Sequence, residues 1–303
     1  MITFKQIDAL YWIAELGSFE AAANKLNMSQ SAISKRIQEL EETFDVEIFD
    51  RSKRNARLTE KGAELLDYAK DLLERRDYML ERVSTREVLV RRFRLGVTEL
   101  TAFTWLPALV EALREAYPKV QIEPSVELSS ELFRKLESDE LDLVIVPDAY
   151  SDSRFLSTPL GSVENAWMCA PGLVSEADPV GLEALAGYTV LTQGSHSGTG
   201  LIYERWLAAH AVQMPRKLTS HNLLVQVGLA LSGVGVSYLP KGCLSHLIER
   251  GELRALVTEP ALPRVGYVAL HRGDRQFGLN QNVAQLAVQC CDFSRLLFSF
   301  SKQ

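Results

Sequence analysis

The chain has 303 residues, of which 47% are hydrophobic and 24% are charged, and its formal net charge is −6. This length suits about two domains, and the composition is that of a globular protein, not of a disordered chain or of one that coats nucleic acid through overall positive charge. No run reaches the roughly 18 apolar residues of a membrane span and no leader pattern opens the chain, so we expect a cytoplasmic protein without membrane contact.

Boundary signals divide the N-terminal region into three short helices. Thr3 and Gln6 have the spacing of a capping box in front of the first helix, and Gly17 suits its end. Ser18 and Ser29 are suitable N-caps for a second and a third helix. The spacing therefore predicts helices that end near residues 16, 26 and 43.

The third predicted helix is amphipathic. Apolar residues spaced by four, three and four positions predict one buried stripe of Ile33, Ile37, Leu40 and Phe44. The remaining face carries the polar candidates for DNA contact, which are Ser29, Gln30, Ser31, Ser34, Lys35 and Gln38. A helix, a short turn and a polar-faced helix form a helix-turn-helix, whose second helix can read the major groove. Bundles that bind no DNA share this pattern, which leaves that alternative open.

The segment after the third helix favours DNA binding. Val46 and Ile48 alternate with charged residues as in a strand, and Leu58 and Thr59 return the chain. The cations between them are Arg51, Lys53, Arg54 and Arg57. We therefore predict a small β-wing that lies beside phosphates, with a solvated loop as the alternative.

A long helix is predicted from residue 59 to about residue 87. Leu65, Leu72 and Met79 recur every seven positions, and Val83 extends their stripe. We find no neighbouring helix in the sequence that would cover the stripe, so we expect it to pair with the same helix of a second subunit. The alternative is a long helix that lies on its own domain.

Strands and helices alternate in the rest of the chain. Strands are expected at residues 93–97, 120–126, 141–146, 167–170, 188–191, 235–238 and 266–270. Helices are expected at residues 103–116, 129–137, 199–210, 222–231 and 281–297, with Ser129 and Ser130 as caps of the second. This is the pattern of a doubly wound α/β fold long enough for two small lobes.

Two ordered sets of motifs carry a family resemblance. The first set contains Gly17-Ser18-Phe19-Glu20-Ala21-Ala22-Ala23, Ser29-Gln30-Ser31-Ala32-Ile33-Ser34 and Glu47-Ile48-Phe49-Asp50-Arg51. The second contains Gly96-Val97-Thr98, Tyr117-Pro118, Glu140-Leu141-Asp142-Leu143 and Gly233-Val234-Gly235. Along nearly the whole chain these residues resemble the LysR-type transcriptional regulators. Ser31, Lys35 and Asp45 depart from the residues common in that family.

The resemblance implies a fold and a set of partners. It implies a winged helix-turn-helix over residues 1–58, a dimerising linker helix over 59–89, and an effector domain like periplasmic binding proteins over 90–303. Lobe one would span about 90–161 plus 267–303, and lobe two about 162–266. The implied partners are promoter DNA, a small carboxylate- or amine-bearing metabolite held between the lobes, and further copies of the chain in a dimer or tetramer. RNA polymerase is a further candidate partner, and no cofactor is expected.

The effector site is expected where strands end and helices begin, because helix N-termini offer free N–H groups. The predicted effector-binding residues are Thr98, Glu99, Thr101, Ser129, Ser130, Asp148, Gly194, Ser195, His196, Ser197 and Thr199. Helix capping is the alternative role for these hydroxyls. If Glu99 faces the cleft, we expect an effector with an amine or hydroxyls, and if it faces solvent, a small carboxylate. Asp148 raises the same question.

Catalysis is not supported by any motif. The segment Gly194 to Gly198 has His196 where a hydrolase nucleophile elbow needs serine. Gly233 and Gly235 lack the third glycine of a dinucleotide fingerprint. The five histidines are too scattered to predict a metal site.

Two non-catalytic alternatives remain. The four cysteines contain no CxxC pair, which excludes a disulfide framework or zinc site. A redox sensor needs an exposed cysteine of low pKa, whereas Cys169 lies in an apolar strand pattern and Cys290 and Cys291 lie in the last predicted helix. The other alternative is a solute-binding module without gene control, which sequence-specific footprinting would distinguish.

Overall fold

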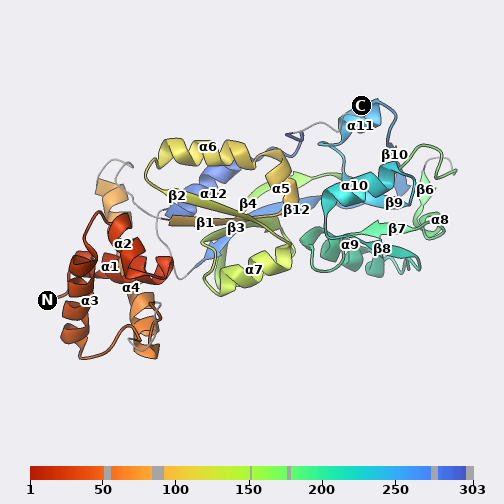
Figure 1. Ribbon diagram of the computed structural model, residues 1–303. Helices are drawn as coiled ribbons and strands as arrows, with labels where there is room; N and C mark the ends of the chain where they lie inside the picture. The colour runs from red at the N-terminus through yellow and green to blue at the C-terminus, as the bar shows by residue number, and fades with distance from the viewer. Residues whose placement is uncertain (51–55, 84–91, 151, 176–178, 274–278, 298–303) are drawn as a thin grey trace. The chain divides into compact units, whose positions relative to one another are not determined.

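The computed structural model describes residues 1–50, 56–83, 92–150, 152–175, 179–273 and 279–297. The chain divides into two compact units, residues 1–85 and 86–303, and each contains its own hydrophobic core (Figure 1). Among the described helices, none combines the length and the hydrophobicity that crossing a membrane requires.

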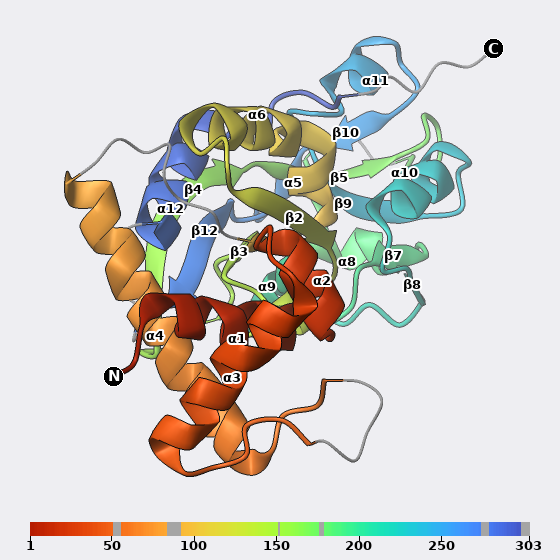
Figure 2. The same cartoon turned by 60° about the vertical axis from the view of Figure 1, so that its left-hand side comes forward.

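The first unit is helical (Figure 2). Its described helices are α1 (Phe4–Leu16), α2 (Phe19–Lys25), α3 (Gln30–Phe44) and α4 (Glu60–Val83). The predicted capping box forms at Thr3 and Gln6, and Gly17 ends α1 in the left-handed conformation with φ 70°. Ser18 and Ser29 accept hydrogen bonds from the first turns of α2 and α3. The local boundary predictions are therefore confirmed.

The buried stripe of α3 is shorter than predicted. Ile33, Ile37 and Leu40 are buried in the core with α1 and α2. Phe44, predicted to join them, is 41% exposed. It is the last residue of α3, and Asp45 then takes the left-handed conformation with φ 55°, so this side chain lies beyond the edge of the core.

Helix α4 is partly covered within its own unit, which corrects the expectation of an uncovered stripe. Ala69 and Leu73 are buried in the core that contains α1, and Arg76 Nη1 donates to Asp8 Oδ1 at 2.8 Å. Leu72 and Met79 are 44% and 53% exposed. One face of α4 is thus packed in the core of its unit, whereas the face that carries Leu72 and Met79 is largely left to solvent. Leu65 is partly buried, and the side chain of Val83 lies outside the described residues.

The described part of the wing holds a single bridge where a strand was expected. Phe49 and Leu58 pair in antiparallel fashion, and Asp50 N donates to Arg57 O at 2.8 Å. The buried Glu41 carboxylate accepts from Ile48 N at 2.8 Å and fixes the start of this segment. The predicted DNA contacts Arg51, Lys53 and Arg54 lie outside the described residues.

Lobe one of the second unit is built on a five-stranded sheet in the order β2-β1-β3-β12-β4. Its strands are β1 (Arg92–Val97), β2 (Gln121–Val126), β3 (Leu143–Pro147), β4 (Phe155–Val163) and β12 (Val265–Arg272). β2, β1 and β3 run parallel, whereas β12 is antiparallel to both of its neighbours. The helices are α5 (Glu99–Thr104), α6 (Leu106–Ala116), α7 (Ser129–Glu137) and α12 (Leu279–Cys290). In Figure 1, α6 and α12 cover one face of the sheet and α7 covers the other.

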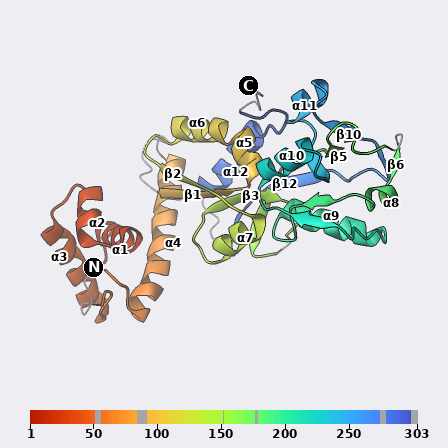
Figure 3. The same cartoon turned by 45° about the vertical axis from the view of Figure 1, so that its right-hand side comes forward.

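Lobe two has a second five-stranded sheet in the order β10-β5-β9-β7-β8. Its strands are β5 (Asn165–Cys169), β7 (Val190–Thr192), β8 (Lys217–Thr219), β9 (Val236–Pro240) and β10 (Arg254–Leu256). The helices are α8 (Leu182–Leu185), α9 (Gly198–Ala209), α10 (Leu223–Leu231) and α11 (Ser245–Glu249), and β6 (Val180–Gly181) pairs with β11 (Thr258–Glu259). Figure 3 shows α9 and α10 on opposite faces of this sheet. The chain passes between the lobes after β4 and again before β12.

Several expected elements differ from the structure. The helix predicted at 103–116 is two helices that meet at Trp105, and the last helix ends at Cys290 and not near Leu297. Strand β4 was not predicted because Pro159 and Gly161 usually interrupt strands, yet an edge position tolerates them. Both sheets are mixed, since strands return in the antiparallel direction.

Candidate functional sites

The solvent-facing side of α3 is the candidate DNA-binding surface. All six predicted polar residues of this helix and its cap are exposed. The Lys35 ammonium lies 4.0 Å from Glu39, an exposed i,i+4 pair that constrains it little. Gln38 Nε2 donates to Glu42 at 3.2 Å, and Ser29 Oγ caps the helix. Arg57 is exposed on the described end of the wing. The surface therefore presents hydroxyls, amides and a cation, which are groups that can contact bases and phosphates.

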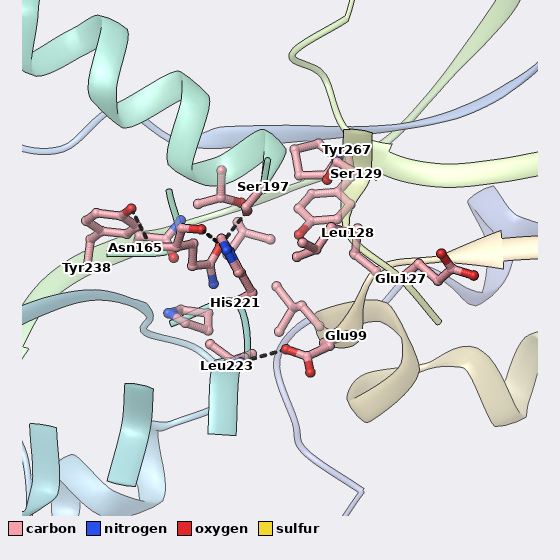
Figure 4. A pocket seen from close by; sticks show the side chains of 17 residues that line it. Glu99, Glu127, Leu128, Ser129, Asn165, Ser197, His221, Leu223, Tyr238 and Tyr267 are labelled. Atoms are coloured by element: carbon pink, nitrogen blue, oxygen red, sulfur yellow. Dashed lines mark hydrogen bonds between the residues drawn. The ribbon is translucent and has the colours of Figure 1, made fainter. Parts of the chain in front are cut away.

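A pocket lies between the two lobes of the second unit. Its cavity volume is about 50 Å³, and the open space around the cavity brings the total to about 570 Å³. Glu99 and Ser129 line it from lobe one, and Ser197 and Tyr238 line it from lobe two (Figure 4). A molecule held there contacts both lobes at once.

The structure brings five of the predicted effector-binding residues together in the pocket. They are Thr98, Glu99, Ser129, Ser197 and Thr199. Thr98 precedes α5 without a side-chain capping bond, and its hydroxyl lies beside that of Tyr267. Ser129 was predicted as a cap, but Leu128 holds the N-cap position of α7 and Ser129 opens the helix. Their hydroxyls are thus not used as caps.

The other predicted residues lie outside the pocket lining. Thr101 is fully buried one turn into α5, and Asp148 is exposed beyond β3. Ser130 and His196 bridge the lobes beside the pocket, where Ser130 N donates to His196 O at 3.1 Å. Gly194 and Ser195 also do not line it.

Sequence reasoning missed six polar residues of the lining. These are Glu127, Asn165, Gln193, His221, Tyr238 and Tyr267. Gln193 follows strand β7, so the same strand-end rule applies to it. Asn165 and Tyr267 lie within strands on either side of the crossovers between the lobes. Without knowledge of the strand order, no local signal singles them out.

The lobe-two wall is held by a connected set of hydrogen bonds. Ser197 Oγ donates to Gln193 Oε1 at 2.6 Å, and Gln193 N donates to the Tyr238 hydroxyl at 3.1 Å. The imidazole of His221 lies with Nδ1 2.9 Å from Gln193 O. Burial raises the pKa of Tyr238 to about 12, which keeps this hydroxyl neutral. The wall is therefore polar, and the Tyr238 hydroxyl within it carries no formal charge at neutral pH.

Tyr267 forms the floor from lobe one. Burial raises its pKa to about 12, while the neighbouring Thr98 and Thr199 hydroxyls oppose the shift. Its ring packs against Phe293, with centroids 4.6 Å apart. This phenol is a neutral donor next to two hydroxyls in the pocket.

Glu99 connects the lobes at another edge of the pocket. Its carboxylate accepts from Asn222 Nδ2 and from Leu223 N, both at 2.6 Å. Burial raises the pKa of Glu99, and the bond from Leu223 N opposes that shift. An acid from α5 thus caps the N-terminus of α10 across the interlobe pocket.

The cysteines lack the features of a redox sensor. Burial raises the pKa of all four thiols, to about 12 for Cys243 and about 11 for Cys291. A reactive sensor needs a lowered thiol pKa. These directions weigh against the redox alternative.

The fold and both surfaces define a regulator with a DNA-reading unit and a two-lobed sensing unit. Residues 4–63 match the model of the bacterial regulatory helix-turn-helix protein, lysR family, and residues 86–289 match the LysR substrate binding domain. The chain belongs to the LysR family of transcriptional regulators. It is a DNA-binding regulator with an effector-binding domain and not an enzyme.

Related proteins share this organisation. The regulator PtxR of Pseudomonas aeruginosa is 28% identical, covering 90% of this chain and 88% of its own. The uncharacterized regulator YbhD of Escherichia coli is 26% identical, covering 83% and 80%. Full-length OxyR of P. aeruginosa matches with TM-score 0.68 at 19% identity, covering 100% and 99%. LysG of Corynebacterium glutamicum, solved with bound arginine, matches with TM-score 0.55 at 17% identity, covering 95% and 99%. The structural matches support the fold.

Proposed function

We propose that a small polar metabolite binds in the pocket between the lobes and controls promoter binding. The observation that carries this proposal is that the pocket takes its lining from both lobes. Thr98, Ser129 and Thr199 supply hydroxyls, and Gln193 supplies an amide. A ligand that contacts both lobes has different affinities for different lobe arrangements, and it therefore shifts their populations.

Thermal unfolding of the full-length chain tests this assignment. A ligand at 100 times its dissociation constant stabilises the folded state by about 2.7 kcal/mol. We expect Ser129→Val to remove that stabilisation. Ser195→Ala is the matched control, because Ser195 is exposed outside the lining. A ligand that stabilises both variants equally would place its site elsewhere.

We propose that α3 reads the operator. In this assignment Gln30 contacts adenine, Lys35 contacts guanine, and Ser31 and Ser34 contact bases or phosphates. Ser29 and Gln38 complete the surface, and the wing cations Arg51, Lys53, Arg54 and Arg57 contact phosphates. Binding to selected operator DNA, compared with random DNA of the same length, separates base reading from charge attraction.

We propose that the exposed face of α4 joins two copies of the chain. Leu72 and Met79 leave an apolar stripe beside the face that packs against α1. Burial of these side chains against the same helix of another copy would form the dimer that reads two half-sites, and two dimers would form a tetramer. Sedimentation of the full-length chain tests the assembly.

A further inference from the structure

The pocket contains an acid without a cationic partner. Arginine and lysine are absent from its described lining, in which Glu99 and Glu127 are the acidic residues. Glu127 forms an ion pair with Lys135. The hydrogen bonds of Glu99 come instead from the amide of Asn222 and the backbone of Leu223. Within the described pocket, its negative charge therefore meets neutral hydrogen-bond donors and no full positive charge.

This arrangement lowers the stability of the folded chain unless a ligand supplies a positive charge beside Glu99. A partly buried carboxylate loses hydration, and neutral donors replace that hydration incompletely. The two donors contact one oxygen each and leave lone pairs on both. Figure 4 shows Glu99 at the end of the pocket away from Ser197 and Ser129. A cation at that end would gain a full charge partner in a partly buried site.

We propose that Glu99 selects an effector with a protonated amine or a guanidinium, which pairs with the Glu99 carboxylate in the pocket. This proposal rests on the proposed role of the pocket as the effector site. The same contact explains how a ligand affects both lobes, because Glu99 belongs to α5 and already holds the N-terminus of α10. A cation bound there shares the carboxylate with α10 and changes the contact between the lobes.

The opposite end of the pocket suits the remainder of such a ligand. Ser129 is nearly fully buried, lines the pocket and opens α7, which is nine residues long. The Ser129 hydroxyl and the positive end of the α7 dipole favour a carboxylate or hydroxyl oxygen, while the Ser130 N–H is already donated to His196 O. The ligand class is therefore an amine or guanidinium that carries an oxygen acceptor at its other end, as in an amino acid with a cationic side chain.

Matched probes test the charge requirement on the full-length chain. Thermal shift is measured with the L-amino acids, with the amines that lack their carboxylate, and with the carboxylates that lack their amine. The variants are Glu99→Gln, which keeps an oxygen acceptor for Leu223 N, and Glu111→Gln, which removes one exposed acid on α6. Unfolding midpoints without any probe verify that both variants fold.

We expect at least one amine-bearing probe to stabilise the wild-type chain and the Glu111→Gln variant, with affinity at least tenfold weaker in Glu99→Gln. We expect no stabilisation by the carboxylates that lack an amine. A carboxylate that binds without an amine and loses binding in Ser129→Val would overturn the role of Glu99 while preserving the pocket as the effector site. An amine that binds Glu99→Gln with wild-type affinity would also overturn it. Absence of binding by every amine-bearing probe would overturn the role of Glu99, while the Ser129→Val test of the pocket would be unaffected.

Discussion

The two units differ in how their functional residues come together. The candidate base-contacting residues of the first unit, Ser29 to Gln38, lie within ten positions on one helix and its cap. The pocket of the second unit combines residues from Thr98 to Tyr267, and its lining draws on both sheets. Helical periodicity alone places the first set on one surface, whereas the second depends on strand order and on the crossovers between lobes. A local motif therefore reveals the first site, and only topology completes the second.

The largest losses of stability should follow from alanine substitution of Gly62 in the first unit and Gly200 in the second. Each substitution should impair only the site in its own unit. A Cβ at Gly62 would overlap the Ile48 carbonyl oxygen, and one at Gly200 would overlap the Gly194 carbonyl oxygen. We expect each alanine variant to lose about 3 kcal/mol of stability or more. Gly62→Ala should impair DNA binding, and Gly200→Ala should impair ligand binding. Urea unfolding with both binding assays measures this.

The control for these two glycines is Gly228→Ala. An added Cβ there meets no atom within 4 Å, and alanine favours the helix. We expect an unchanged or slightly higher stability. If a folded Gly62→Ala or Gly200→Ala variant lost both DNA binding and ligand binding, the result would contradict the claim that each glycine supports only one site.

Adjacent leucines of α4 distinguish folding from assembly. Leu73 is buried in the core, so Leu73→Ala should cost about 2–4 kcal/mol of unfolding free energy. Leu72 is 44% exposed and lies outside the core, so Leu72→Ala should change monomer stability by less than about 0.5 kcal/mol while it weakens self-association. Denaturant unfolding and sedimentation give the two quantities. Unchanged association in Leu72→Ala would remove this side chain from the proposed dimer.

If α3 reads bases, substitutions on its exposed face should reduce the preference of the chain for operator DNA over random DNA. Lys35→Ala or Gln30→Ala should weaken operator binding by about 1–3 kcal/mol with little effect on random DNA. Fluorescence anisotropy at fixed salt measures both affinities. Equal losses on the two DNAs would reduce these residues to non-specific contacts.

The smallest effect concerns pH. Because burial raises the pKa of Glu99 above its ordinary 4.5, the folded chain binds this proton more tightly than the unfolded chain. The stability that this carboxyl contributes is present below pH 4.5 and is lost as pH rises through its folded-state pKa. Without ligand, Glu99→Gln should therefore gain stability relative to wild type as pH rises from 4.5. Urea unfolding across pH, with Glu111→Gln as baseline, checks this, and a flat difference would contradict it.

The sequence predicts the elements better than the site. Caps such as Thr3 and Ser29 depend on near neighbours, so their positions were predictable. Thr98 and Ser129 were found because polar residues after strands meet at one sheet edge. Tyr267 was not, since its place beside Thr98 depends on a strand that returns from the other lobe.

Errors in the predicted site have a related origin. Thr101 follows Thr98 by three positions, but α5 turns it into the core, where it is fully buried. Phe44 fits the apolar spacing of α3, yet the helix ends there. Helical periodicity predicts the direction in which a side chain points. It does not predict where the packed core beside the helix ends.

The central claim is that occupancy of the interlobe pocket changes DNA binding by the first unit. The most direct measurement is operator affinity of the full-length chain, with operator DNA obtained by in vitro selection, with and without the probe that stabilises the chain. We predict that the probe changes the affinity about fivefold or more in the wild-type chain and leaves Ser129→Val unchanged. An equal change in both, or no change in the wild-type chain at saturation, would contradict the account.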